Sequence, residues 1–122
     1  MSHLTERFEA AVLLLVAEGP VKQRLSRAYS DYLEGLEPSD LPQGVGAAYR
    51  DLDAALHRVA PLGTETRAKA SIRKMSTADA ARYAESIVAM YGQLWRHGER
   101  AEPLKIVEPS ARSVPAFLVN GS

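Results

Sequence analysis

Apolar side chains recur along this chain at the spacing of an α-helix, in segments that glycine and proline separate. The segments span about residues 4–18, 20–36, 41–59, 64–75 and 76–97. Within each segment, apolar residues return every three or four positions, which gathers them on one face of a helix. No segment alternates apolar and polar residues for long enough to indicate a strand. Because short connections join the segments, we predict an all-α fold, a compact antiparallel bundle of about five helices.

Capping residues define the expected ends of these helices. Asp40 is placed to cap the third helix, and Thr64 is placed to cap the fourth. Ser76 followed by Asp79 has the pattern of a capping box, which would start the fifth helix. Gly98 fits the left-handed position just past the end of that helix.

The fifth helix is expected to turn a wide apolar face toward the core. Its inward residues are expected to be Ala80, Ala84, Ile87, Val88, Tyr91, Leu94 and Trp95. Most aromatic residues of the chain fall on such faces, and we expect their hydroxyl or indole N–H groups to reach the surface. Tyr83 lies off this face and is expected to be partly exposed. With Arg82 beside it, Tyr83 suits a protein interface, where tyrosine and arginine are enriched.

The helical pattern stops near residue 98. Prolines then recur at positions 103, 109 and 115, and the apolar pieces between them are too short for helices. We expect a helical domain over residues 1–98 and an extended or disordered tail over 99–122. Phe117 and Leu118 are the main apolar anchors of that tail, and short extended segments with such anchors are a common mode of docking to a protein.

Charge and composition limit the classes of function. The chain has 15 Lys and Arg residues against 15 Asp and Glu residues, so no overall field attracts nucleic acid or an anionic membrane. It has no cysteine, which excludes disulfides, thiolate nucleophiles and cysteine-bound metals. The longest apolar run, residues 10–17, is much shorter than the roughly 20 residues of a membrane span. Acidic residues precede that run, which is unlike a secretory signal, and we expect a cytoplasmic protein.

The first helix is apolar nearly all round. Leu13 and Leu14 lie well away from the stripe that contains Phe8 and Leu15. Helices of this kind are usually central in a bundle or shared with a second chain. The pattern therefore indicates homodimerisation through this helix as one way for the protein to associate.

The fourth helix carries a stripe of four cations. They are Arg67, Lys69, Arg73 and Lys74, and they lie opposite Ala68, Ile72 and Met75. Such a stripe suits contacts with nucleic-acid phosphates. The competing interpretation is a solvated outer face that balances acidic residues elsewhere, as most charge runs do. An isolated phosphate site at the start of the next helix is disfavoured, because Asp79 would place a carboxylate there.

The second helix also begins with cations. Lys22, Arg24 and Arg27 lie on its polar face, and a glycine in the preceding turn is compatible with a helix-turn-helix motif. Asp31 and Glu34 share that face, however, and Arg27 can pair with Asp31 four positions later. Mixed charge of this kind favours an exposed, salt-bridged surface over a helix that reads DNA.

Catalytic and metal-binding patterns are missing from the sequence. His57 and Asp53 are four positions apart, but a zinc site needs at least three protein ligands, so we expect a surface contact. No serine elbow, phosphate loop or dinucleotide fingerprint occurs. We therefore expect no enzymatic activity and no cofactor.

Two functions remain open on this basis. The first is a non-enzymatic helical interaction module, a small adaptor or regulator that binds a protein partner and also itself. Its expected contacts are the basic stripe, Arg82, Tyr83, Phe117 and Leu118. The alternative is a nucleic-acid-binding regulator that uses the basic stripe of the fourth helix.

Overall fold

The computed structural model describes residues 3–101 and confirms the all-α bundle. Its five α-helices are α1 (His3–Leu15), α2 (Val21–Ala28), α3 (Gln43–Ala55), α4 (Arg67–Lys74) and α5 (Thr77–Ala101). A π-helix, Tyr29–Leu33, continues α2, and a 3-10 turn, Pro38–Asp40, precedes α3. No strand occurs within residues 3–101. From residue 102 onward the expected tail lies outside the described residues.

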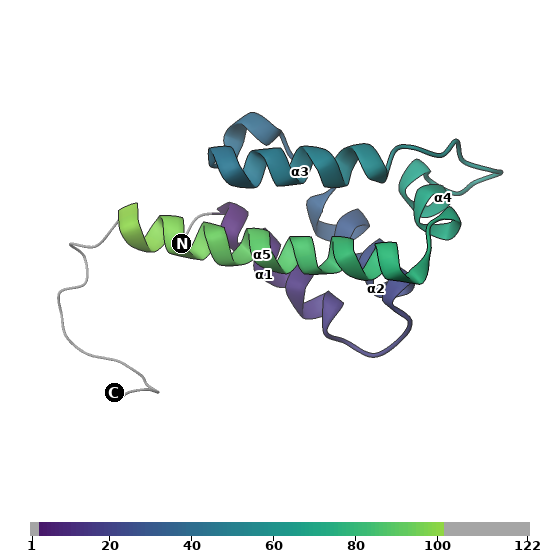
Figure 1. The fold of residues 1–122 in the computed structure, drawn as a ribbon, viewed down its shortest axis with the longest axis horizontal. Helices are drawn as coiled ribbons and strands as arrows, with labels where there is room; N and C mark the ends of the chain where they lie inside the picture. Colours follow the sequence, from purple (N-terminus) through teal and green to yellow (C-terminus); the bar gives the residue numbers. More distant parts are fainter. Residues whose placement is uncertain (1–2, 102–122) are drawn as a thin grey trace.

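The longest helix, α5, organises the bundle. With 25 residues it is about 37 Å long, and Figure 1 shows it spanning most of the helical part of the molecule. It packs against α1, α2 and α3, and α1 packs in turn against α2. α4 lies at one end of the bundle, where it contacts α2 and leads directly into α5 (Figure 1).

Every α-helix contributes to one hydrophobic core. The largest fully buried side chains are Phe8, Leu25, Tyr29, Leu33, Val45, Tyr49, Leu52, Leu56, Ile87 and Met90. Burying one large apolar side chain contributes about 1.5–3 kcal/mol, so these faces hold the bundle together. Val88 and Trp95 of α5 were expected among them, but they are 45% and 48% exposed.

The second helix changes its geometry at Tyr29. A single helix over residues 20–36 was predicted, whereas α2 ends at Ala28 and a π-helix follows. The amide of Glu34 donates to the carbonyl of Tyr29 at 2.8 Å, which spans five residues instead of the usual four. Gly35 then takes a φ of 86°, a left-handed conformation that ends the helix. Apolar periodicity could not predict this turn, because it reports faces and not hydrogen-bond spacing.

Tyr49 of α3 closes the end of the π-helix. Its buried hydroxyl donates to the carbonyl of Leu33 at 2.5 Å and accepts from the amide of Leu36 at 3.2 Å. Arg7 of α1 makes a similar contact, since its Nε donates to the carbonyl of Tyr32 at 2.8 Å. Carbonyls at a helix end have no partner within the helix, so side chains from two other helices satisfy them here.

Tyr29 is also hydrogen-bonded to α3. Its buried hydroxyl donates to Oδ1 of Asp53 at 2.5 Å. Burial, reinforced by this hydrogen bond, raises the pKa of Tyr29, and burial also raises the pKa of Tyr49. Both hydroxyls therefore remain protonated donors. The expectation that tyrosine hydroxyls reach the surface is wrong for these two residues, because α3 offers them partners inside the bundle.

The cap of α4 differs from the prediction. Thr66 caps the helix, with its side-chain oxygen accepting from the amide of Lys69 at 3.1 Å. Thr64, the expected cap, lies in a turn that the amide of Glu65 closes by donating to the carbonyl of Leu62 at 3.1 Å. Both threonines can cap a helix, so the local sequence did not distinguish them.

The start of α3 also differs. Asp40 lies in the 3-10 turn, and Pro42 occupies the N-cap position in its place. The turn folds against the first part of α3 at Gly46, where an added Cβ would lie 2.9 Å from the carbonyl oxygen of Pro38. This close approach is a tertiary contact, and it needs a residue without a side chain.

The predicted start of α5 is correct, and its predicted end is wrong. Ser76 caps the helix as predicted, accepting from the amide of Asp79 at 3.0 Å. The predicted end at Gly98 is wrong, because α5 continues to Ala101 and Gly98 has no left-handed φ. A glycine inside a helix costs only about 1 kcal/mol, so it does not stop a helix by itself.

Candidate interaction surfaces

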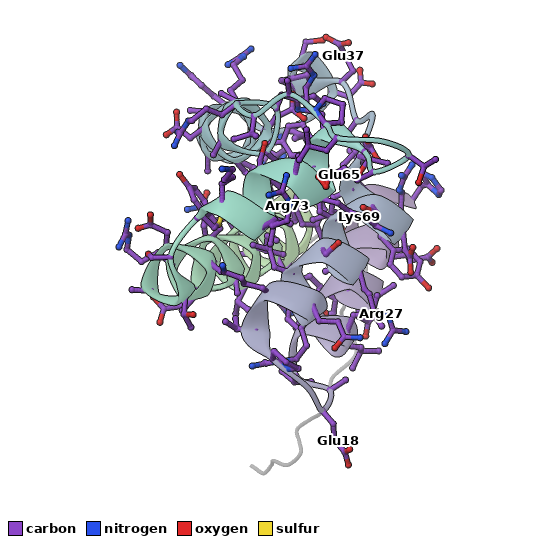
Figure 2. All side chains as sticks on the ribbon, turned by 90° about the vertical axis from the view of Figure 1, so that its right-hand side faces the viewer. Glu18, Arg27, Glu37, Glu65, Lys69 and Arg73 are labelled. Atoms are coloured by element: carbon purple, nitrogen blue, oxygen red, sulfur yellow. The ribbon has the colours of Figure 1, made fainter. Side chains whose placement is uncertain are left out.

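The four cations predicted on the fourth helix lie exposed on α4. The opposite side of α4 is buried, with Ala68 and Ile72 in the core, as the apolar spacing predicts. Figure 2 looks onto this end of the bundle and shows Lys69 and Arg73 on α4, with Arg27 of α2 below them. The exposed cations are Arg67, Lys69, Arg73 and Lys74. α4 therefore presents a basic face to solvent.

Arg73 is already paired within the fold, because Glu65 accepts hydrogen bonds from two nitrogens of its guanidinium. Its Nε lies 3.2 Å from both carboxylate oxygens of Glu65, and its Nη2 lies 2.9 Å from Oε2. This bond lowers the pKa of Glu65 and raises the pKa of Arg73, so the pair stays ionised. Among the described side chains, no carboxylate lies within ion-pair distance of Arg67, Lys69 or Lys74.

Replacing Arg73 with glutamine is expected to raise the pKa of Glu65 toward its ordinary value, because the hydrogen bond that stabilises the carboxylate is lost. Carboxyl titration by NMR measures this directly. A depressed folded-state pKa stabilises the protein above the unfolded-state pKa, and that stabilisation disappears as the pH falls through the folded value. Lys74→Gln is the matched control, since Lys74 is exposed and has no contact with Glu65. An equal shift in both variants would contradict a specific Arg73–Glu65 pair.

Two cations of α2 donate hydrogen bonds to backbone carbonyls of the bundle. Arg24 donates through Nε to the carbonyl of Gly19 at 2.8 Å and through Nη1 to the carbonyl of Leu15 at 2.5 Å, which closes the turn after α1. Lys22 donates to the carbonyl of Arg73 at 3.3 Å, at the end of α4. Neither residue is thus placed as a free DNA-reading cation, which weakens the helix-turn-helix interpretation of α2.

The expected pair between Arg27 and Asp31 is not formed within the part of the chain that the structure describes. The helix changes from α to π geometry between them, at Tyr29. Residues four apart no longer lie directly above one another across such a turn. The prediction failed because it assumed a continuous α-helix.

Arg82 and Tyr83 take different positions on α5. Arg82 is exposed and pairs with Asp79 one turn earlier. Tyr83 is partly exposed, with its ring packed against the core cluster. Their role at an interface stays a prediction. Phe117 and Leu118, the predicted anchors of the tail, lie outside the described residues.

His57 and Asp53 do make the expected local contact. Nδ1 of His57 lies 2.7 Å from the carbonyl oxygen of Asp53 and 3.6 Å from its Oδ1. The ring of Tyr29 meets the imidazole edge-on, with 6.4 Å between the ring centroids. Within residues 3–101, no cluster of three histidine, aspartate or glutamate side chains is arranged to hold a metal ion.

α5 carries two parallel lines of apolar residues, displaced from each other by one position. The inner line is buried or partly buried in the core and consists of Ala80, Tyr83, Ile87, Met90 and Leu94. The second line, here called the outer seam, consists of Ala81, Ala84, Val88, Tyr91 and Trp95. Alternating steps of three and four residues are the spacing with which one helix packs along another. α5 thus has one helix-packing face in its own bundle and, beside it, a second line in which Val88 and Trp95 are exposed while Ala84 and Tyr91 are partly buried against the core.

The outer seam was not identified from the sequence. Its residues merge with the inner line into one wide apolar stripe, so Val88 and Trp95 were assigned to the core. The sequence does show two apolar lines that are offset by one residue. It does not show which line faces the core, because that depends on where the neighbouring helices lie. Near α1, Leu13 is 63% exposed, and Val16, just after the end of the helix, is 71% exposed.

No protein-family model, curated protein or solved structure matches the chain. Among the described helices, none is long and apolar enough to cross a membrane. Function is therefore inferred from the surfaces of α4 and α5 themselves.

Proposed function

We propose that this chain is a non-enzymatic helical interaction module, a small adaptor or regulatory protein, and that a protein partner packs on the outer seam of α5. The observation that carries the proposal is the exposure of Val88 and Trp95 on a well-formed helix whose bundle already has a closed core. Apolar residues at helix-packing spacing are what a partner helix recognises. Tyrosine and tryptophan are also prominent among the residues that dominate binding energy at interfaces.

Nucleic-acid binding is the second candidate, supported by the exposed cations Arg67, Lys69 and Lys74 on α4. It is weaker for two reasons. A phosphate at Arg73 would meet the carboxylate of Glu65, which already binds two of the guanidinium nitrogens and offsets their charge. In addition, the overall charge is balanced, so attraction to a polyanion would be confined to a few contacts.

Val88→Glu in the full chain is expected to abolish co-purification of a stoichiometric protein partner from a lysate of the organism that encodes the protein. A carboxylate would then lie at the centre of an apolar seam, which is strongly unfavourable at an interface. The measurement is affinity capture of the tagged protein, with quantification of the partner-to-bait ratio.

Ala89→Glu is the matched control, because Ala89 is the next residue on the same helix and is exposed outside the seam. It is expected to retain the partner. Equal recovery of the partner with both variants would exclude the outer seam as its binding surface. Retention on mixed nucleic acid that falls steeply with salt, without a protein partner, would favour the second candidate.

A further inference from the structure

We propose that the outer seam of α5 binds a second copy of this chain, with the two α5 helices antiparallel. This inference rests on the proposed function and names the partner of the same surface. It differs from the dimer through α1 that the sequence indicated, since the contact runs along α5. In Figure 1, α5 is drawn over α1 and α2, so one long side of the helix faces away from them.

The seam is complementary to itself in size when the helices run antiparallel. With the two-fold axis midway between Ala89 and Met90, residues equally far from the axis face each other across the interface. The facing pairs are Val88 with Tyr91, Ala84 with Trp95 and Ala81 with Gly98. Each large side chain meets a smaller one, which lets helices approach closely without leaving voids.

Charge on the outer flank of the seam supports the same orientation. Glu85 and Arg96 are both exposed and lie on the same side of the seam, with the Cα of Arg96 two positions farther from that axis than that of Glu85. The guanidinium of Arg96 extends back over Gly92, with Nη1 3.5 Å from where a Cβ of Gly92 would lie, so it borders the seam. Antiparallel packing therefore places Glu85 of each copy near Arg96 of the other, a favourable pair that also fixes orientation.

Parallel packing lacks these advantages. It would set Trp95 against Trp95 and Ala84 against Ala84, so that one layer is crowded and another is empty. Glu85 of one copy and Arg96 of the other would also lie on opposite sides of a parallel interface, so their favourable pair could not form. The orientation is thus a specific part of the proposal and can be tested separately from association.

The chain provides its own reporter for this interface. Trp95 is the single tryptophan in the sequence and is 48% exposed. Sedimentation equilibrium at chain concentrations from about 1 to 100 μM is expected to show a monomer–dimer equilibrium. Trp95 emission should shift to shorter wavelength as the dimer forms. Val88→Glu is expected to raise the dissociation constant at least about tenfold, because each dimer buries the charge twice, while Ala89→Glu leaves it unchanged.

Cysteine cross-linking tests the orientation, since the natural chain has no cysteine. A mixture of the single variants Ala81→Cys and Gly98→Cys is expected to form a mixed disulfide dimer on mild oxidation. Each variant alone should cross-link poorly, because its two cysteines would lie far apart in an antiparallel pair. Ala78→Cys, on the outer polar face of α5, is the control for random collision. Efficient cross-linking of Ala81→Cys with itself would overturn the antiparallel arrangement.

The tail is the competing occupant of the seam, and the double variant Phe117→Ser/Leu118→Ser distinguishes it. If the tail covered the seam within one chain, this variant would shift Trp95 emission to longer wavelength in dilute solution, and that result would overturn the proposal. A monomer at about 100 μM with full-length chain would also overturn it. Such failures leave the proposed function separately testable, because capture of a different protein would still be lost in Val88→Glu and kept in Ala89→Glu.

Discussion

Tyr49→Phe is expected to lower the free energy of unfolding by about 2–4 kcal/mol, although the ring and its packing are retained. The hydroxyl donates to the carbonyl of Leu33 and accepts from the amide of Leu36 at the end of the π-helix. Removing it leaves two backbone groups without their partner, each at a cost of about 1–3 kcal/mol where water cannot replace it. Urea denaturation followed by circular dichroism measures the change.

Tyr32→Phe is the matched control for that experiment. Tyr32 belongs to the same π-helix, but its side chain is 37% exposed, and its hydroxyl has no hydrogen-bond partner among the described residues. Its loss is expected to change stability by less than about 0.5 kcal/mol. Similar losses for the two variants would mean that Tyr49 acts through its ring and not through the bonds of its hydroxyl.

Gly46→Ala is expected to destabilise the protein by about 1–3 kcal/mol, against the usual advantage of alanine in a helix. The new Cβ would lie 2.9 Å from the carbonyl oxygen of Pro38, and that oxygen belongs to backbone that cannot swing away. The 3-10 turn would therefore have to move off the start of α3. Thermal and urea unfolding both report the loss.

Gly44→Ala, two residues earlier in α3, should have the opposite sign. Its Cβ would lie 3.3 Å from Oε1 of Gln93, the end of a flexible and exposed side chain that can move aside. The variant is expected to be neutral or more stable by up to about 1 kcal/mol. Destabilisation by both alanines would show that α3 needs glycine for its backbone and not for the contact with Pro38.

Tertiary structure makes the four cations of α4 unequal. The sequence presents Arg67, Lys69, Arg73 and Lys74 as equivalent cations on one helix face. In the fold, Arg73 is paired with Glu65, a residue eight positions away whose approach depends on the loop before α4. Helix periodicity describes neighbours three or four positions apart, so it contains no information about such a pair.

The sequence by itself determined the helical class, the approximate position of each helix and most of the core, because apolar spacing acts through local geometry that every helix shares. It also located Ser76 as a cap, since that bond spans only three residues. Tertiary structure decided what depends on contacts between helices. It decided which residues of the two apolar lines on α5 are exposed. It also set the π-helix, whose first and last residues, Tyr29 and Leu33, are hydrogen-bonded to Asp53 and Tyr49 of α3. The outer seam exists for the same reason: burial is decided by the neighbours of a helix, and the neighbours of α5 leave Val88 and Trp95 of its second apolar line exposed.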